Sequence, residues 1–251
     1  MRQAEELYRE SKLTEAISSL QALLREHPSE KKARNFLFEL LCFAGEFERA
    51  RKQLSILAEE SNESRLGVAF YFAALAAELE RQTYYGDRAS PQTEDTSGAP
   101  SGASEGLSGS FNGKPFSSIR DLDARLGPSL EFLAAGRYHR IAFRNLSRLE
   151  IAEPKRLRDL YWLPANAQTA ESLGAEELDS ILIPVLYPHT YLFDDDQTRL
   201  GRTTDWALAD AGAEIPCGQR ILLIDGVEVP LLQVRSLEFG PPGEGDRTGH
   251  V

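Results

Sequence analysis

Cysteine is scarce in this sequence of 251 residues, which contains only Cys42 and Cys217. The two lie far apart and outside any Cys-x-x-Cys pattern, so neither a disulfide framework nor a zinc module is indicated. Such a composition is typical of proteins in a reducing compartment. The polar, acidic residues 1–6 also lack the features of a signal peptide. These observations together predict a cytoplasmic protein.

Long apolar runs and an excess of positive charge are missing as well. The longest nearly apolar stretch, residues 67–77, is too short to cross a bilayer. The chain has 28 Lys and Arg against 39 Asp and Glu, which gives a formal net charge of −11. Binding to phosphate backbones or to anionic lipids needs a surplus of basic residues. We therefore expect no nucleic-acid partner and no membrane insertion.

Sequence signatures of catalysis and of metal binding are also lacking. The chain has no Gly-x-Ser-x-Gly turn and no P-loop, because Gly113-Lys114 is followed by Pro115. Asp194–Asp196 follow closely on His189, but three consecutive carboxylates rarely converge on one ion, and no EF-hand pattern surrounds them. We interpret this segment as a solvated loop, and we predict no catalytic residue, no cofactor and no metal site.

The sequence does contain an internal repeat in its first 60 or so residues. A shift of 34 positions superimposes apolar on apolar residues, namely Leu7 on Leu41, Leu13 on Phe47, Ala16 on Ala50, Leu20 on Leu54 and Leu23 on Leu57. Thirty-four residues is the period of the tetratricopeptide repeat, which is a pair of helices. Gly45 falls in the turn between two helices, and Pro28 follows a helix that it would end.

The apolar periodicity predicts helices near 3–11, 14–27, 30–44, 46–60 and 64–82. Thr14 and Ser29 are plausible N-caps of the second and third helices. The fifth segment is apolar on most sides, so we expect it to be largely buried and to close the repeats. Stacked helix pairs form a concave groove that holds a helix or peptide of another protein. The alternative is that two repeats pack only against the rest of the chain.

The pattern changes after residue 85. Residues 86–114 are rich in Gly, Ser and Pro and predict a flexible linker. Beyond it, residues 119–135 have helical spacing with a break at Gly127-Pro128. Strands are predicted at 138–143, 147–151 and 181–187, and a hairpin at 221–232 turns at Asp225-Gly226 and is extended by 233–237. The end of the chain, 240–251, is predicted to be disordered.

We therefore expect an α+β protein in which an all-α, tetratricopeptide-like domain precedes a β-rich mixed domain. Its boundaries are 1–85 for the helical domain, 86–114 for the linker, 115–239 for the β-rich domain and 240–251 for the tail. The hydrophobic fraction of 41% makes a sizeable core available.

Partner-binding candidates come from the aromatic residues and the arginines close to them. Phe36 and Phe38 lie in the third predicted helix, and the two tryptophans lie in Arg158–Ala165 and Leu200–Trp206. Exposed Trp and Arg are typical anchors of protein interfaces. More often such residues are buried aromatics held by charge-assisted hydrogen bonds, and we favour that interpretation for both tryptophan segments. The candidates are Phe36, Phe38, Arg158, Trp162, Arg202 and Trp206.

Several motifs occur in an order that resembles the ImpE family, also called the TagJ or SciE-type proteins. The helical segment FLFELLCFAGEFERARKQL is similar to the start of these proteins. The second half continues with FNGKPFSSIRDLDARLGPSLEFLAAGRYHRI, PKRLRDLYWLPA, LIPVLYPHTY, RLGRTTDW and GQRILLIDGVEVPLLQVR. The resemblance covers nearly the whole chain outside the linker and the tail. One departure is the segment Gly136–Phe143, where family members tend to carry the aromatic-rich GRYYWVPF.

The resemblance implies a non-enzymatic adaptor of a bacterial type VI secretion system. Proteins like this are thought to bind the small sheath subunit TssB and, through it or directly, the ATPase ClpV. No catalytic residues are known for the family, so none is carried over. The alternative is a small-ligand-binding or hydrolytic domain in the second half, with Asp194–Asp196, His189 and Arg202 around a pocket.

Overall fold

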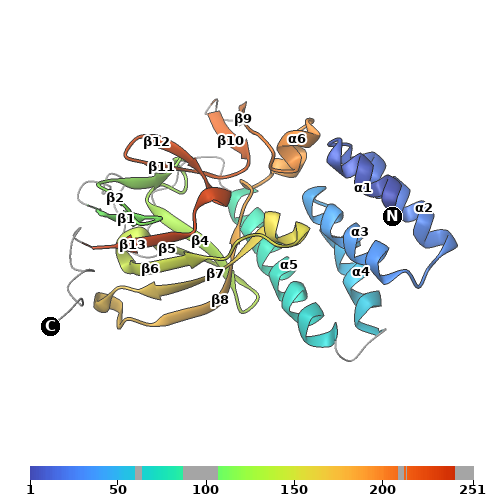
Figure 1. Ribbon diagram of the computed structural model, residues 1–251, viewed down its shortest axis with the longest axis horizontal. Coiled ribbons are helices and arrows are strands. Elements are labelled where there is room, and N and C mark those ends of the chain that lie inside the picture. The colour runs from blue at the N-terminus through green and yellow to red at the C-terminus, as the bar shows by residue number, and fades with distance from the viewer. Residues whose placement is uncertain (60–63, 87–106, 209–211, 213, 241–251) are drawn as a thin grey trace.

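The computed structural model describes the chain except for residues 60–63, 87–106, 209–211, 213 and 241–251. Helices precede strands along it (Figure 1). The helical half consists of α1 (Arg2–Arg9), α2 (Leu13–Glu26), α3 (Lys31–Phe43), α4 (Phe47–Glu59) and α5 (Ser64–Gly86). These bounds agree with the five predicted helices to within a few residues, and the succession of helical and β-rich halves confirms the α+β class. Within the described ranges, no helix has both the length and the apolar character needed to cross a bilayer.

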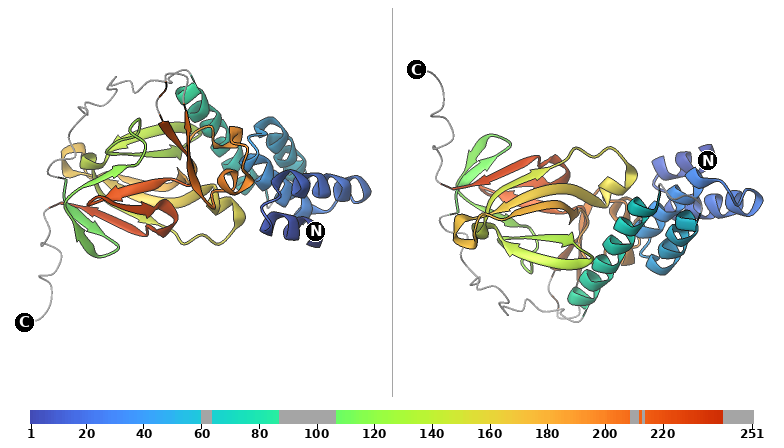
Figure 2. Two further views of the ribbon diagram at one scale, coloured as in Figure 1. Left: turned by 90° about the horizontal axis from the view of Figure 1, so that it is seen from above. Right: turned by 90° about the horizontal axis from the view of Figure 1, so that it is seen from below.

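The first four helices stack as two antiparallel pairs, as the repeat predicts (Figure 2). Neither predicted N-cap is correct, because α2 follows Lys12 and α3 follows Glu30, and neither residue caps with its side chain. The first amide of α2, on Leu13, donates instead to Asp196 Oδ2 at 2.7 Å. A carboxylate from the second half thus satisfies a helix end that a local side chain usually caps.

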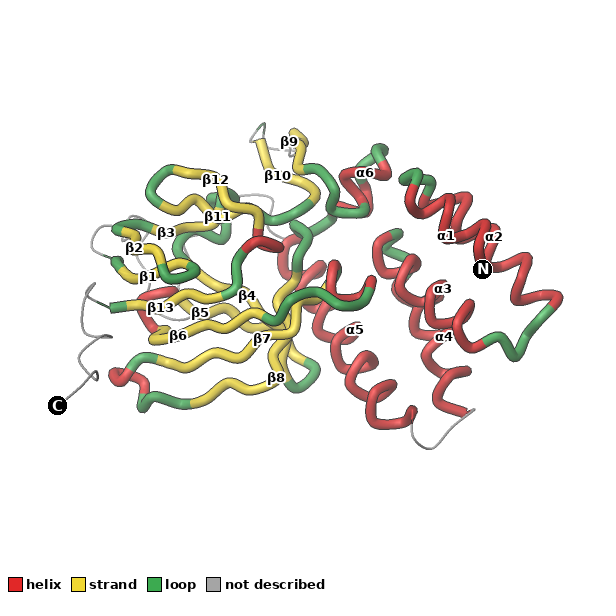
Figure 3. The backbone as a smooth tube through the Cα atoms, viewed as in Figure 1, coloured by secondary structure: helices red, strands yellow, loops and turns green. Residues whose placement is uncertain are grey.

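The described residues of the second half form short antiparallel strands in three sheets (Figure 3). The largest sheet has the order β2-β1-β13-β6-β7-β8-β4-β5, a second has the order β12-β11-β3, and β9 pairs with β10 alone. The strand bounds are β1 Gly109–Phe111, β2 Lys114–Phe116, β3 Ile119–Asp121, β4 Ser129–Ala134, β5 Arg137–Ala142, β6 Leu146–Ile151, β7 Trp162–Thr169, β8 Glu177–Pro184, β9 Thr204–Leu208, β10 Glu214–Gly218, β11 Ile221–Ile224, β12 Val227–Pro230 and β13 Ser236–Phe239.

The hairpin at Asp225-Gly226 is confirmed, since β11 and β12 flank a turn in which both residues have positive φ. The predicted extension by residues 233–237 is wrong. β13 leaves the hairpin and pairs with β1 and β6 in the large sheet.

The helix predicted over residues 119–135 is wrong, because this segment forms β3 and β4. All but the last residue of β4 are buried, so the strand lacks the apolar–polar alternation that identifies a half-exposed strand. Its neighbours are β5 and β8, and α5 also packs against it. A strand buried on both faces produces apolar spacing that a helix can also satisfy.

The predicted linker is too long at its C-terminal end. Residues 87–106 lie outside the described residues, as does nearly all of the predicted tail. Residues 109–116 form β1 and β2, and β1 pairs with β13. A side chain at Gly109 would collide with the carbonyl oxygen of Glu238, so glycine here permits close strand contact. A glycine-rich strand of this kind resembles a linker in composition.

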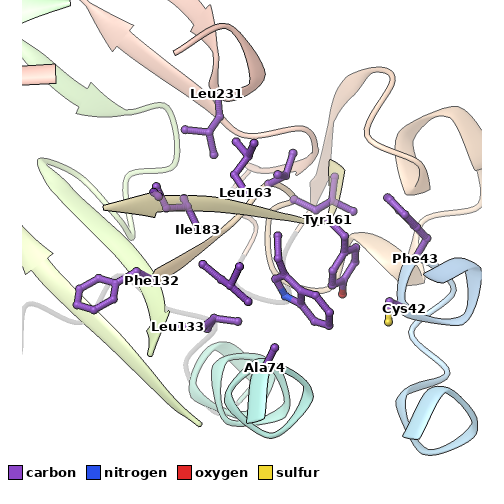
Figure 4. Packing of buried hydrophobic residues seen from close by; sticks show 14 of the residues in the cluster. Cys42, Phe43, Ala74, Phe132, Leu133, Tyr161, Leu163, Ile183 and Leu231 are labelled. Carbon is purple, nitrogen blue, oxygen red and sulfur yellow. The ribbon is translucent and has the colours of Figure 1, made fainter. Parts of the chain in front are cut away.

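The two halves share one continuous apolar core (Figure 4). Cys42 and Phe43 of α3 and Ala74 of α5 belong to the same buried cluster as Leu133 of β4 and Ile183 of β8. Tyr161 lies between the halves, with its ring centroid 5.1 Å from that of Phe43. The predicted boundary near residue 85 therefore separates types of secondary structure rather than separate cores.

Gly45, in the turn after α3, gives a test of how closely the halves pack. Its φ is +71°, and a Cβ there would overlap the ring of Tyr191 in η4 (Thr190–Leu192). Gly45→Ala is expected to lower the free energy of unfolding by about 2 kcal/mol, through backbone strain and overpacking. Urea unfolding followed by circular dichroism measures the change.

The matched control for this prediction is Gly67→Ala in α5. No atom lies within 4 Å of a Cβ at Gly67, and that glycine is helical and exposed. This variant should raise the free energy of unfolding by roughly 0.5 to 1 kcal/mol. Equal effects of the two substitutions would contradict the close contact between Gly45 and Tyr191.

Candidate partner-binding groove

A hollow of about 430 Å³ lies between the helical repeats and a short segment of the second half. The helical side comes from α1 and α3, and the opposite side from η2 (Leu157–Leu160). The lining residues are Met1, Glu5, Tyr8, Arg9, Phe36, Glu39, Leu157 and Leu160. Met1, Glu5 and Tyr8 are spaced so that they share one face of α1.

The groove has an apolar floor and a charged rim. Tyr8 and Phe36 meet edge to face, with ring centroids 5.9 Å apart. Leu157 and Leu160 are half-buried opposite them, whereas Glu5 and Arg9 add charges of both signs. This arrangement fits a short amphipathic helix or peptide that inserts an apolar side chain beside the charges of Glu5 and Arg9.

Arg158 fixes η2 to the helical repeats. Its guanidinium donates to Glu39 Oε1 at 2.8 Å and to Asn35 Oδ1 at 2.9 Å, and it lies 4.8 Å from the centroid of the Tyr71 ring. Asp159 holds the turn itself, because its carboxylate accepts from the amides of Lys155 and Arg156. The groove therefore has two walls from distant parts of the sequence.

Burial makes Glu39 electrostatically unusual. It raises the pKa of Glu39 above the ordinary value, against the opposing effect of Arg158 and the amide of Asn35. A buried carboxylate at the end of a groove needs these donors to stay charged. Glu39 and Arg158 thus form a largely buried ion pair at the edge of the groove. Glu5 and Arg9 are the charged residues of the lining that a partner can reach more easily.

Arg202 acts as a clamp on α1. Its guanidinium donates to the carbonyl oxygens of Tyr8 at 2.6 Å and Arg9 at 2.7 Å, and to Ser11 Oγ at 2.7 Å. It also lies 4.8 Å from the centroid of the Tyr8 ring. Cations are favourable at a helix C-terminus because the last carbonyl groups lack partners within the helix. Arg202 therefore positions Tyr8, which lines the groove, without lining the groove itself.

The candidate residues are not all available to a partner. Phe38 is fully buried and Trp162 is 1% exposed, with its indole N–H donating to Glu78 Oε2 at 3.1 Å. Both belong to the core, so their side chains do not reach the surface. Phe36 lines the groove. Arg158 and Arg202 do not line it, but Arg158 holds η2 in place and Arg202 holds α1 in place. Trp206 is 46% exposed on β9 and does not line the groove. The buried interpretation thus holds for Trp162 and is wrong for Trp206.

In the described part of the chain, Asp195 and Asp196 already have partners at helix ends, which does not support a pocket around Asp194–Asp196. Asp195 caps the short helix α6 (Asp196–Arg199) by accepting from the amide of Thr198 at 2.8 Å. Asp196 accepts from Leu13 and pairs with Arg199. No cluster of three potential metal-binding side chains occurs in the described part of the chain. Asp195 is exposed, as the solvated-loop interpretation expects, but Asp195 and Asp196 each cap the start of a helix.

Sequence reasoning missed most of the lining residues. Only Phe36 was expected among the eight that line the hollow. The sequence did contain one signal for the second wall of the groove. Leu157 and Leu160 are apolar, three residues apart, and directly precede Tyr161-Trp162. Their contact with α1 depends on the tertiary fold, which brings together segments about 150 residues apart.

Comparison with known proteins supports both halves of this description. A family model described as ImpE protein matches residues 113–238, and a tetratricopeptide repeat model matches residues 7–67. The solved structure of protein VPA1032 from Vibrio parahaemolyticus has a TM-score of 0.80 over 95% of this chain and 97% of that one. At 22% identity, this likeness shows the fold alone.

A relative with a curated description is closer in sequence. The type VI secretion system accessory component TagJ of Pseudomonas aeruginosa is 33% identical over 264 residues, which span 95% of this chain and 91% of that protein. Together with the match to the family model across the β-rich half, this similarity shows that the chain belongs to the ImpE family.

Proposed function

We propose that the chain is a non-enzymatic adaptor that binds a helix or peptide of another secretion-apparatus protein in the groove between α1, α3 and η2. Its TagJ relative is described as an accessory component of a type VI secretion system, which supports an accessory role in such a system. The observation that carries the proposal is the two-walled hollow with an apolar floor at Tyr8 and Phe36.

The partners in this proposal are the sheath subunit TssB and the ATPase ClpV, and the site of action is the cytoplasm. The apolar floor suits the buried face of a partner helix, and the charges of Glu5 and Arg9 suit its polar flanks. The groove is open, so a partner helix can enter without separation of the two halves of the chain.

Co-purification of the full chain with TssB and with ClpV tests the proposal. Phe36→Asp should weaken retention of the groove partner at least tenfold, because it places a charge on the apolar floor. Since Phe36 is only half-buried, the variant should keep the wild-type circular dichroism spectrum. If the wild-type chain retains neither protein, the adaptor proposal is wrong.

A matched control is Leu173→Asp in η3 (Glu171–Leu173). Leu173 is 48% exposed and does not line the groove. This substitution introduces the same charge at an exposed apolar position, so it should leave retention unchanged. Equal losses in the two variants would indicate a general effect of charge and would remove the groove from the proposal.

A further inference from the structure

The hairpin of β9 and β10 presents a second surface, distinct from the groove. These strands form a two-stranded sheet, so the outer edge of β9 has no neighbouring strand within the described residues. Bare edges are usually avoided in native proteins, because their unpaired N–H and C=O groups can bind another chain. The hairpin projects beside α6 at the top of Figure 1.

The register shows which backbone groups face outward. The amide of Gln219 donates to the carbonyl oxygen of Thr203 at 3.3 Å, and antiparallel pairs alternate between bonded and non-bonded. Asp205 and Ala207 therefore face β10, whereas Thr204, Trp206 and Leu208 present their backbone groups to the outer edge. Pro216, which has no N–H, stands opposite Trp206, as expected for a non-bonded pair.

The outward residues also bear the exposed apolar side chains. Trp206 is 46% exposed and Leu208 is 78% exposed. They are two residues apart in one strand, so they lie on the same face. The Trp206 amide meets only the side chain of its neighbour Asp205, at 2.8 Å. Exposed tryptophan beside an open strand edge is typical of a surface that binds a protein.

Charge indicates the kind of protein. The described part of segment 204–218 contains Asp205 and Glu214, and it has no Lys or Arg. A second copy of the same hairpin would bring acidic residues against acidic residues. A strand with Lys or Arg between apolar residues would instead meet opposite charge.

We propose that the outer edge of β9 accepts an extended, basic and apolar segment of another protein as an added antiparallel strand. The outward backbone groups of Thr204, Trp206 and Leu208 supply the hydrogen bonds, and the side chains of Trp206 and Leu208 supply the apolar contact. This surface is separate from the groove, so the chain can hold two partner segments at once.

A synthetic peptide of alternating Lys and Val, seven residues long and blocked at both ends, tests the edge on the full chain. Trp206 reports binding, because the other tryptophan, Trp162, is already buried. The emission of Trp206 should shift to shorter wavelength as its indole leaves water. Hydrogen exchange should slow at the amides of Thr204, Trp206 and Leu208.

Two control peptides and one variant separate strand addition from simple charge attraction. A peptide N-methylated at every residue has no backbone N–H and cannot pair, and one with Glu in place of Lys has the wrong charge, so neither should shift the emission. Leu208→Pro removes an outward N–H while keeping the bonds to β10, and it should weaken binding at least tenfold.

The outcomes that overturn the proposal are equally specific. No emission shift at millimolar peptide, equal binding of the N-methylated peptide, or unchanged binding by Leu208→Pro would each exclude an added strand. A concentration-dependent dimer that protects the same amides would assign the edge to a second copy instead. Phe36→Asp should bind the peptide as the wild type does, so failure of the groove proposal and failure of this one are distinguishable.

Discussion

Replacement of Arg81 by alanine is expected to lower the free energy of unfolding by about 3 to 5 kcal/mol, since it removes the cation that two buried carboxylates share. Arg81 of α5 is 1% exposed. It donates to both oxygens of Glu131, at 3.0 and 2.6 Å, and to Glu78 at 3.0 Å. A fourth bond reaches the carbonyl oxygen of Leu186 at 2.8 Å.

The effect should be large because Glu78 and Glu131, which lose Arg81, are themselves buried. Glu131 is fully buried in β4, and its remaining cationic partner is Arg220, at 3.1 Å. Although burial alone would raise the pKa of Glu131, Arg81 and Arg220 lower it to about 2. The stability that this carboxylate contributes is present above its unfolded pKa, near 4.5, and is lost as the pH falls toward 2.

Urea unfolding at neutral pH measures the loss, and Arg148→Ala serves as the control. Arg148 pairs with Glu150 on an exposed strand surface, so its removal should change the free energy of unfolding by less than about 1 kcal/mol. A loss below about 1 kcal/mol for Arg81→Ala would mean that the buried network does not hold α5 to the sheet.

Phe38→Asp is expected to abolish folding. Phe38 is fully buried, with its ring centroid 6.0 Å from that of Tyr71. An unpaired buried charge costs several kcal/mol, in addition to the lost packing, and this total is comparable to the whole stability of a domain. Far-ultraviolet circular dichroism and thermal unfolding measure the outcome.

The comparison with Phe36→Asp makes this prediction specific. The two phenylalanines are two residues apart in α3, and such residues point to different sides of a helix. Phe38→Leu should fold, because it keeps an apolar side chain in the core. A cooperative thermal transition of Phe38→Asp near that of the wild type would contradict the fully buried position.

Those two residues also show what could be predicted from the sequence. The apolar period located α3 and the repeat, because helix spacing is a local property. It did not show which phenylalanine faces the groove, since the buried side of α3 depends on α5 and on the second half. Phe36 is therefore a candidate that the structure places at the groove, and Phe38 is one that it places in the core.

The remaining differences have the same origin. Asp196 caps α2 from 183 positions away, so no local pattern could replace the expected Thr14. β4 is buried on both faces, so its spacing indicated a helix. The wall at Leu157 and Leu160 is formed by a loop whose position depends on Arg158 reaching Glu39. Local signals predicted the elements, and long-range hydrogen bonds determined how they meet.

The clamp of Arg202 on α1 has a consequence for synthesis of the chain. Arg202 and the carbonyl group of Arg9 are 193 positions apart. At about 5 to 20 residues per second, the ribosome needs roughly 10 to 40 s to make the intervening chain. During that time the last carbonyl groups of α1 lack Arg202, and the first amide of α2 lacks Asp196. The groove is completed only after residue 202 has been synthesised, so shorter nascent chains are not yet competent to receive a partner.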